Sequence, residues 1–109
     1  MHQAVPVVQP DGMKVVNYAT YTPVREKVVA LGPAHREYMT RLHADGRLVA
    51  YGPFPDGSGA LFIYETGSLA AAQEILAADP YQIGGVFVRC QLSAWDIVKA
   101  NPVLIPAMG

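Results

Sequence analysis

Residues 48–65 read LVAYGPFPDGSGALFIYE, and this stretch decides the fold. Leu48–Tyr51 is a short apolar run that stops at Gly52-Pro53, and Ala60–Glu65 is a second run rich in apolar and aromatic residues. The intervening FPDGSG consists almost wholly of turn-forming residues. Two short strands joined by such a loop predict a β-hairpin in the middle of the chain.

A helical pattern precedes the hairpin. The chain turns helical from Val24, and Gly32-Pro33 interrupts the pattern. Proline is favoured in the first turn of a helix, where its missing N–H is not needed, so we expect Pro33 to open the main helix. That helix should end near Ala44, because Asp45-Gly46 follows. Helical spacing places its apolar side chains on one stripe, formed by Ala34, Tyr38, Met39 and Leu42.

A second helical pattern follows the hairpin. Ser68 is a good N-cap, because its hydroxyl can accept a hydrogen bond from a free backbone N–H of the first turn. Asp79-Pro80 should end this helix, since the residue before a proline is pushed out of helical geometry. The predicted buried stripe consists of Leu69, Ala72, Ile75 and Leu76.

One further strand is predicted before the hairpin and the two helices, and one after them. Residues 13–21 (MKVVNYATY) are rich in β-branched and aromatic residues, and residues 85–95 form the last strand. Alternation along the last strand puts two sets of side chains on opposite faces. We expect one face to carry Val86, Val88, Cys90 and Leu92, and the other to carry Phe87, Arg89, Gln91 and Ser93.

The resulting order is βαββαβ, which is the ferredoxin-like α+β arrangement. It predicts a four-stranded antiparallel sheet with both helices on one face. At 109 residues the chain has the length of one domain. We therefore expect a flexible N-terminal leader over residues 1–12, one domain over 13–96 and a non-helical tail over 97–109.

Composition points to a covered surface. The chain is 51% hydrophobic but only 16% charged, with a net charge of −1, which excludes a disordered chain and the basic stripe of a nucleic-acid-binding protein. Two predicted strands carry apolar residues on both faces, whereas the helices cover one face only. We therefore expect the other face to pack on the sheet of a second copy. The residues expected to line that homodimer interface are Phe62, Tyr64 and Phe87.

The sequence also limits the compartment and the chemistry. It has one cysteine, Cys90, no basic n-region at its start and no apolar run of bilayer-spanning length, which together favour the cytoplasm. It contains no phosphate-binding loop, GxSxG, HExxH or paired-cysteine motif, and His35 and His43 are eight positions apart. Neither a metal site nor a cofactor is predicted.

Four polar or reactive side chains have mostly apolar neighbours in the sequence. Placed in the first turn of the main helix, His35 would be favoured as neutral imidazole, so it could act as a general base or simply be a half-buried structural residue. Asp79 ends a helix, where a carboxylate is disfavoured, so it is either functional or a common turn former. We expect Arg89 to bind an anionic ligand if its face of the last strand lines a cavity, and to be a solvated surface residue if that face is open. Cys90 is expected to be a small core residue rather than a nucleophile.

At these residues the sequence resembles the YciI-like (YCII-related) family of dimeric α+β barrel proteins. The likeness rests on GPAHREYM at 32–39, DGRLVAYGP at 45–53, SLAAA at 68–72 and DPY at 79–81, taken in that order. It implies a protomer whose sheet pairs with that of a partner, and a cleft lined by the family's histidine and aspartate. These two residues map onto His35 and Asp79. A relative is implied to remove chloride from a chlorinated hydroxyhydroquinone with such a pair.

The resemblance and the residues together favour a cofactor-independent lyase or isomerase. His35 would be the general base, and Asp79 would fix its tautomer, on a small phenolic or cyclic acid substrate. The alternative is a non-catalytic homodimer that binds a small ligand or serves as an accessory module. A cofactor-free monooxygenase is a weaker third hypothesis, favoured only by Trp95 and the aromatic lining. The residues predicted to bind substrate are Tyr38, Gly52, Pro53, Tyr81 and Arg89.

Overall fold

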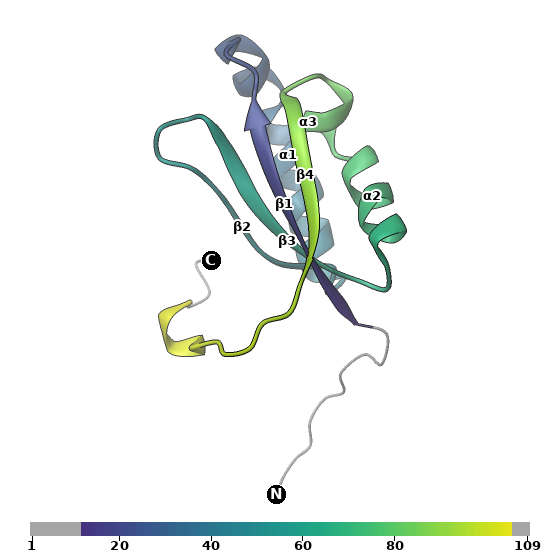
Figure 1. Cartoon of the computed structure of the whole chain (residues 1–109). Coiled ribbons are helices and arrows are strands. Elements are labelled where there is room, and N and C mark those ends of the chain that lie inside the picture. The colour runs from purple at the N-terminus through teal and green to yellow at the C-terminus, as the bar shows by residue number, and fades with distance from the viewer. Residues whose placement is uncertain (1–11, 106–109) are drawn as a thin grey trace, which may run out of the picture.

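A computed structural model describes residues 12–105 and shows the predicted fold (Figure 1). Its four strands form one antiparallel sheet in the order β2-β3-β1-β4, and the helices cover one face of that sheet. The α+β ferredoxin-like prediction is therefore confirmed. The elements are β1 (Met13–Tyr21), α1 (Arg25–Ala44), β2 (Leu48–Pro53), β3 (Gly59–Thr66), α2 (Leu69–Ala77), α3 (Pro80–Ile83), β4 (Phe87–Trp95) and a 3-10 turn (Pro102–Leu104).

Helix α1 differs from its prediction because Pro33 lies inside it. A proline within a helix removes the hydrogen bond to the carbonyl four residues earlier, which here belongs to Val29. The helix nevertheless continues through Pro33 from its start at Arg25, so His35 lies in its middle rather than in its first turn. Ala34 is exposed, and His35 takes a place on the buried face.

The segment after the hairpin contains one more helix than predicted. Ser68 caps α2 as expected, with its Oγ accepting from the N–H of Ala71 at 3.0 Å. Leu69 is exposed, however, so the buried stripe of α2 is Ala72, Ile75 and Leu76. Asp79 ends this region as predicted but also begins the one-turn helix α3, which the sequence pattern did not indicate.

A bulge in β4 decides where its first residues point. Thr20 of β1 pairs with Arg89 and Tyr21 pairs with Phe87, which leaves Val88 as the extra residue of β4. The bulge reverses the alternation at this end, so Phe87 joins the covered face together with Cys90 and Leu92. The prediction that Phe87 shares the open face with Arg89 is therefore wrong.

Strands β1 and β3 carry apolar side chains on both faces, as expected, but the predicted interface residues lie on the covered face. Phe62, Tyr64 and Phe87 are all buried in the core beneath the helices, so they cannot line an interface formed by the open face. Strand alternation and register place other side chains on the open face. These are Val16, Tyr18, Leu61, Ile63 and Trp95, of which Tyr18 and Trp95 are more than 40% exposed.

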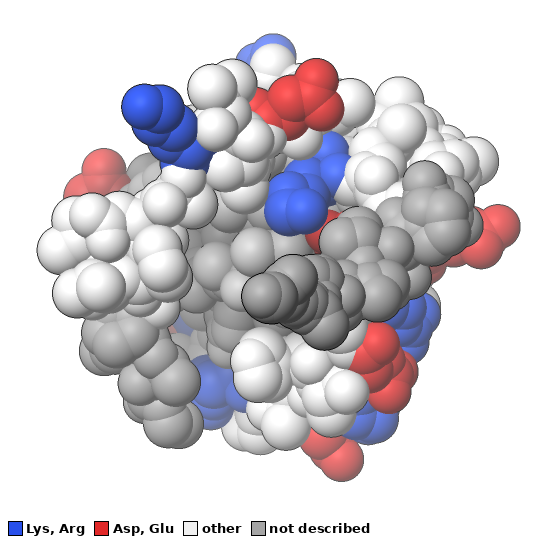
Figure 2. Space-filling model, turned by 90° about the horizontal axis from the view of Figure 1, so that it is seen from below, with Lys and Arg blue, Asp and Glu red and all other residues white. Residues whose placement is uncertain are grey.

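The remaining surface bears charges of both signs. On the face seen in Figure 2, Lys and Arg side chains alternate with Asp and Glu rather than gathering into one basic area among the described residues. Within residues 12–105, no helix is both long enough and apolar enough to cross a membrane. The predicted leader lies almost wholly outside the described residues. The predicted tail contains a short 3-10 turn instead of purely irregular chain.

Candidate functional site

His35 and Asp79 lie in direct contact although they are 44 positions apart in the sequence. His35 Nδ1 is 2.8 Å from Asp79 Oδ1, and both side chains are almost fully buried, at 4% and 0% exposed. The middle of α1 faces the sheet and carries His35 inward, while the α2–α3 junction brings Asp79 to the same point. The fold therefore assembles the pair that the sequence singled out.

Asp79 is held in place by its own backbone surroundings. It caps α3, and its Oδ1 accepts the N–H of Tyr81 at 2.9 Å as well as the contact with His35. A carboxylate is favoured at a helix N-terminus, where backbone N–H groups are free. The expectation that Asp79 lies at an unfavourable helix end is therefore wrong, because the start of α3 provides it with a donor.

Aromatic rings enclose the imidazole of His35. The ring of Tyr81 stacks on it in parallel, with centroids 3.9 Å apart and 5° between the planes. Tyr51, Phe62 and Phe87 meet it edge-on, at centroid distances between 5.7 and 6.2 Å. These rings come from α3, β2, β3 and β4, so most of the fold contributes to one enclosure. In such an apolar setting the interaction between His35 and Asp79 is stronger than it would be in water.

Tyr81 is fixed at both ends. Its phenol donates to the carbonyl of Val28 in α1 at 3.1 Å, and its backbone N–H donates to Asp79. Burial raises the pKa of the Tyr81 phenol, so the group stays protonated and remains a donor at neutral pH. Tyr81 is therefore held with its ring parallel to that of His35, while its predicted role in binding substrate stays a prediction.

The second oxygen of the carboxylate lacks a partner. Asp79 Oδ2 is fully buried and accepts no hydrogen bond from the described residues. A buried acceptor left unpaired costs about 1–3 kcal/mol, so natural proteins keep few of them. Asp79 Oδ2 is therefore an unsatisfied acceptor next to His35 within the described residues.

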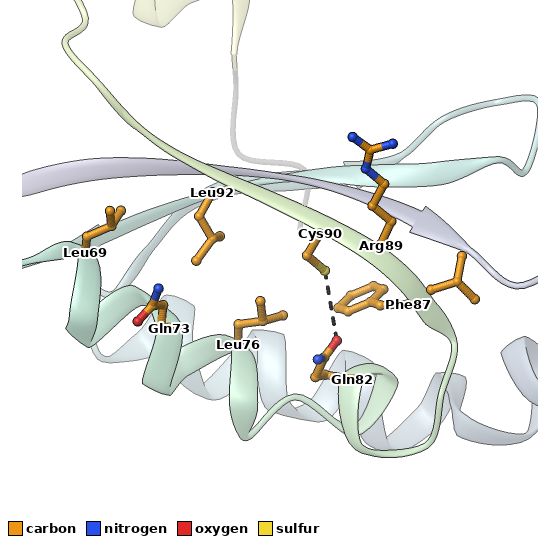
Figure 3. Close-up of a pocket in the computed structure, with 9 residues that line it drawn as sticks. Leu69, Gln73, Leu76, Gln82, Phe87, Arg89, Cys90 and Leu92 are labelled. Carbon is orange, nitrogen blue, oxygen red and sulfur yellow. Dashed lines mark hydrogen bonds between the residues drawn. The ribbon is translucent and has the colours of Figure 1, made fainter.

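Four of the predicted binding residues do not contact His35. The phenol of Tyr38 donates to the carbonyl of Ile75 at 2.7 Å, which ties α1 to α2. Gly52 and Pro53 belong to the edge strand β2 and border a shallow hollow of about 260 Å³ with Leu61 and Ile63 of the open face. Arg89 points to the open face, away from the helices (Figure 3).

Three residues of the enclosure were missed in the sequence. Tyr51 directly precedes Gly52-Pro53, and its ring stacks on Phe62 at a centroid distance of 5.6 Å. The sequence pattern predicts Phe62 and Phe87 on the open face instead. An aromatic residue in an apolar strand gives no signal of the histidine it contacts, because that histidine comes from a distant helix.

A cavity of about 460 Å³ lies between α2 and β4 (Figure 3). Phe87 belongs to both places, since it contacts His35 and also lines the cavity. His35 and Asp79 themselves do not line the cavity. Within residues 12–105, no group of three or more His, Cys, Asp or Glu side chains is placed to hold a metal ion.

Two curated proteins are similar in sequence. The chain is 43% identical over 65 residues to the uncharacterized protein YjpA of Bacillus subtilis, covering 60% of this chain and 75% of YjpA. It is 38% identical over 72 residues to protein YciI of Escherichia coli O6:H1, covering 57% of this chain and 74% of YciI.

A solved structure shares the fold. It is the 5-chloro-2-hydroxyhydroquinone dehydrochlorinase TftG from Burkholderia phenoliruptrix AC1100, in complex with 2,5-dihydroxybenzoquinone. It matches with a TM-score of 0.69 and 21% identity, covering 77% of this chain and 94% of TftG. The model of the YCII-related domain matches residues 13–96, which include every element from β1 to β4. The chain therefore belongs to the YCII-related domain family.

Proposed function

We propose that the chain is a cofactor-independent enzyme in which His35 removes a proton from a small ring-shaped substrate, so that a leaving group departs or a double bond moves. The observation that carries the proposal is the 2.8 Å contact between His35 Nδ1 and Asp79 Oδ1 inside an aromatic enclosure. The fold shared with a dehydrochlorinase, a lyase-type enzyme that acts on a ring, supports the same class of reaction.

The geometry assigns a role to each nitrogen of His35. With Nδ1–H donating to Asp79, the neutral imidazole has its lone pair on Nε2, which is the base. Asp79 orients the ring and stabilises the imidazolium that forms when Nε2 takes the proton. Tyr81 prevents the ring from turning, because it stacks on one face of the imidazole. The proton accepted by Nε2 is then available to the departing group or to another carbon of the substrate.

Nitrogen NMR of His35 tests this assignment without a substrate. We expect the Nδ1–H tautomer at pH values where the ring is neutral, and we expect Asp79→Asn to change the tautomer of His35. The exposed His43 of the same helix is an internal reference. A neutral His35 that carries its proton on Nε2 would show that Nε2 is not the base.

Kinetics test the roles on a substrate that the protein turns over, starting with chloride release from 5-chloro-2-hydroxyhydroquinone. We expect His35→Gln to lower kcat by about 10²–10⁴-fold and Asp79→Asn to lower it on the order of a thousandfold. His43→Gln and Glu37→Gln, which change exposed side chains of α1, should leave kcat unchanged. Folded His35→Gln and Asp79→Asn with wild-type kcat would favour the non-catalytic, ligand-binding alternative.

A further inference from the structure

We propose that residues 98–105 form an arm that docks on a second copy of the chain, where it fills the hollow around Gly52. The arm follows β4, and its 3-10 turn lies below the sheet in Figure 1, apart from the other helices and strands. The hollow lies on the open face at the edge strand β2. Each copy offers one arm and one hollow, as a two-fold dimer requires.

The arm exposes apolar side chains that nothing else in the described part of its own chain covers. Single exposed apolar residues are common on protein surfaces, but a contiguous group of them marks an interaction site. Lys99 is the one charged residue of the arm, so apolar surroundings suit the rest of it. The side chains that are between 68% and 89% exposed are those of Val98, Val103, Leu104 and Ile105.

The turn of the arm is preformed. Asn101 caps it, because its Oδ1 accepts the N–H of Val103 at 3.2 Å, and Pro102 fixes the backbone of its first residue. The N–H groups of Leu104 and Ile105 donate to the carbonyls of Asn101 and Pro102. Among the described residues, the hydrogen bonds of this turn therefore stay within it. A preformed segment loses less conformational freedom when it docks, which favours binding.

The hollow matches the arm in size and chemistry. Its volume of about 260 Å³ is below the roughly 300–1,000 Å³ of small-molecule sites, so a few aliphatic side chains suit it better than a free ligand. Gly52 keeps it open, because a Cβ atom at this position would meet no other atom within 4 Å. The described residues that line the hollow carry no charge, and they are Ala50, Tyr51, Gly52, Pro53, Leu61 and Ile63.

A second copy is the occupant that the position of the arm favours. Within one chain the arm and the hollow both stay uncovered. The arm begins just after Trp95, which belongs to the open face that we expect a second copy to cover, so the arm continues that interface. Eight residues extend to at most about 26–29 Å, whereas four strands measure about 14 Å across, so the arm of one copy can reach the edge strand of another.

Docking would also cover Tyr51, which connects the hollow to the candidate site. Tyr51 is 40% exposed, lines the hollow and meets the ring of His35 edge-on at a centroid distance of 5.9 Å. An arm in the hollow would exclude water from the outer side of the Tyr51 ring. Any effect of this on catalysis rests on the proposed function, whereas the docking itself requires no turnover. The two proposals can therefore fail separately.

Two variants disrupt the contact from opposite sides. Leu104→Glu puts a charge on the arm, and Gly52→Leu fills the hollow. Neither disturbs the packing of one chain, because Leu104 is exposed and Gly52 has free space beside it. A two-fold dimer contains the contact twice, so we expect each variant to raise the dimer dissociation constant at least about tenfold in analytical ultracentrifugation. Val29→Glu on α1 and Val49→Leu on β2 are the matched controls and should leave it unchanged.

Mixing the two variants decides whether the arm docks between chains or within one chain. Leu104→Glu keeps a normal hollow and Gly52→Leu keeps a normal arm, so their heterodimer regains one contact that both homodimers lack. Fluorescently labelled Gly52→Leu is titrated with unlabelled Leu104→Glu. After correction for the statistical advantage of mixed pairs, we expect the heterodimer to bind at least about threefold more tightly than either homodimer.

A folded Gly52→Leu with the dissociation constant of the wild-type protein would overturn the inference. A mixture without preference for the heterodimer would overturn it as well, because the arm would then act within its own chain or on another surface. Val103→Glu replaces Leu104→Glu in both measurements if the latter fails to fold, since Val103 is equally exposed to solvent on the same turn.

Discussion

The two faces of the sheet differ in their surroundings, although β3 carries apolar side chains on both of them. The covered face carries Phe62 and Tyr64 beneath the helices, together with the buried polar side chain of Asn17. The open face carries Leu61 and Ile63, which alternate with them along β3, and no helix covers these two residues. Neighbouring residues of one strand therefore lie in two different environments, one beneath the helices and one on the open face. Amino-acid composition alone cannot distinguish these environments.

This difference explains where the candidate chemistry lies. A hydrogen bond between His35 and Asp79 is strong only where water is excluded, and the helices exclude water on the covered face. The open face has no such enclosure within one chain. We expect it to be covered by the sheet of a second copy, because an exposed apolar area of this kind marks an interface.

The largest expected effect is on stability and contrasts neighbours on the two faces. Phe62→Ala deletes a fully buried ring that contacts His35, and should lower the free energy of unfolding by about 3–5 kcal/mol. Leu61→Ala, one residue earlier, should cost the isolated chain less than about 1 kcal/mol. Urea unfolding of both variants at a concentration where the protein is monomeric checks the contrast. Equal losses would mean that the faces are not distinct.

The next effect concerns association through the open face. Ile63→Glu places a charge at the centre of the expected interface, and we expect the dimer dissociation constant to rise at least about a hundredfold while the monomer stays folded. Val29→Glu, at an exposed position of α1, is the control and should leave the dissociation constant unchanged. Light scattering measures both. A wild-type chain that is monomeric at micromolar concentration would contradict the prediction of a dimer.

A smaller effect decides the role of Tyr38, which the sequence predicted to bind substrate. In the structure its phenol ties α1 to α2 through the carbonyl of Ile75. Tyr38→Phe should therefore lower the free energy of unfolding by about 1 kcal/mol and leave KM unchanged. Urea unfolding and steady-state kinetics on the same preparation distinguish the two roles. A raised KM with unchanged stability would assign Tyr38 to binding.

Local sequence signals predicted most of the fold. Ser68 as an N-cap, Asp45-Gly46 as a helix end and the turn residues between β2 and β3 act within a few positions, so their patterns are visible in the chain. His35 and Asp79 were also identified from the sequence, as polar residues in apolar company and through the family resemblance. Their contact, however, could be shown only by the structure.

The remainder depended on packing between distant segments. Helix α1 continues through Pro33, and Asp79 caps the single turn of α3, although the local sequence pattern indicates neither feature. The bulge at Val88 moves Phe87 from one face to the other, and nothing in the alternating pattern of residues 85–95 indicates an extra residue. A shift of one residue in the pairing of a strand is therefore sufficient to make the sequence pattern predict the wrong face for a side chain of the site.

The smallest expected effect is a loss of stability at alkaline pH, and it concerns Tyr21 at the edge of the covered face. Tyr21 is half-buried there, next to Tyr81 and Phe87, and burial is the main cause that raises its pKa from 10.0 to about 12. Between these two values the folded chain holds the phenol proton more tightly than the unfolded chain, whose tyrosine has a pKa near 10. Stability present below about pH 10 should therefore fall as the pH rises toward about 12.

Tyr21→Phe should make this fall shallower, while the buried Tyr64 maintains part of it, because burial raises its pKa too. Urea unfolding at several alkaline pH values measures how steeply the free energy of unfolding falls with pH. Identical slopes in the wild-type protein and in Tyr21→Phe would show that Tyr21 is not shielded from water in the folded chain.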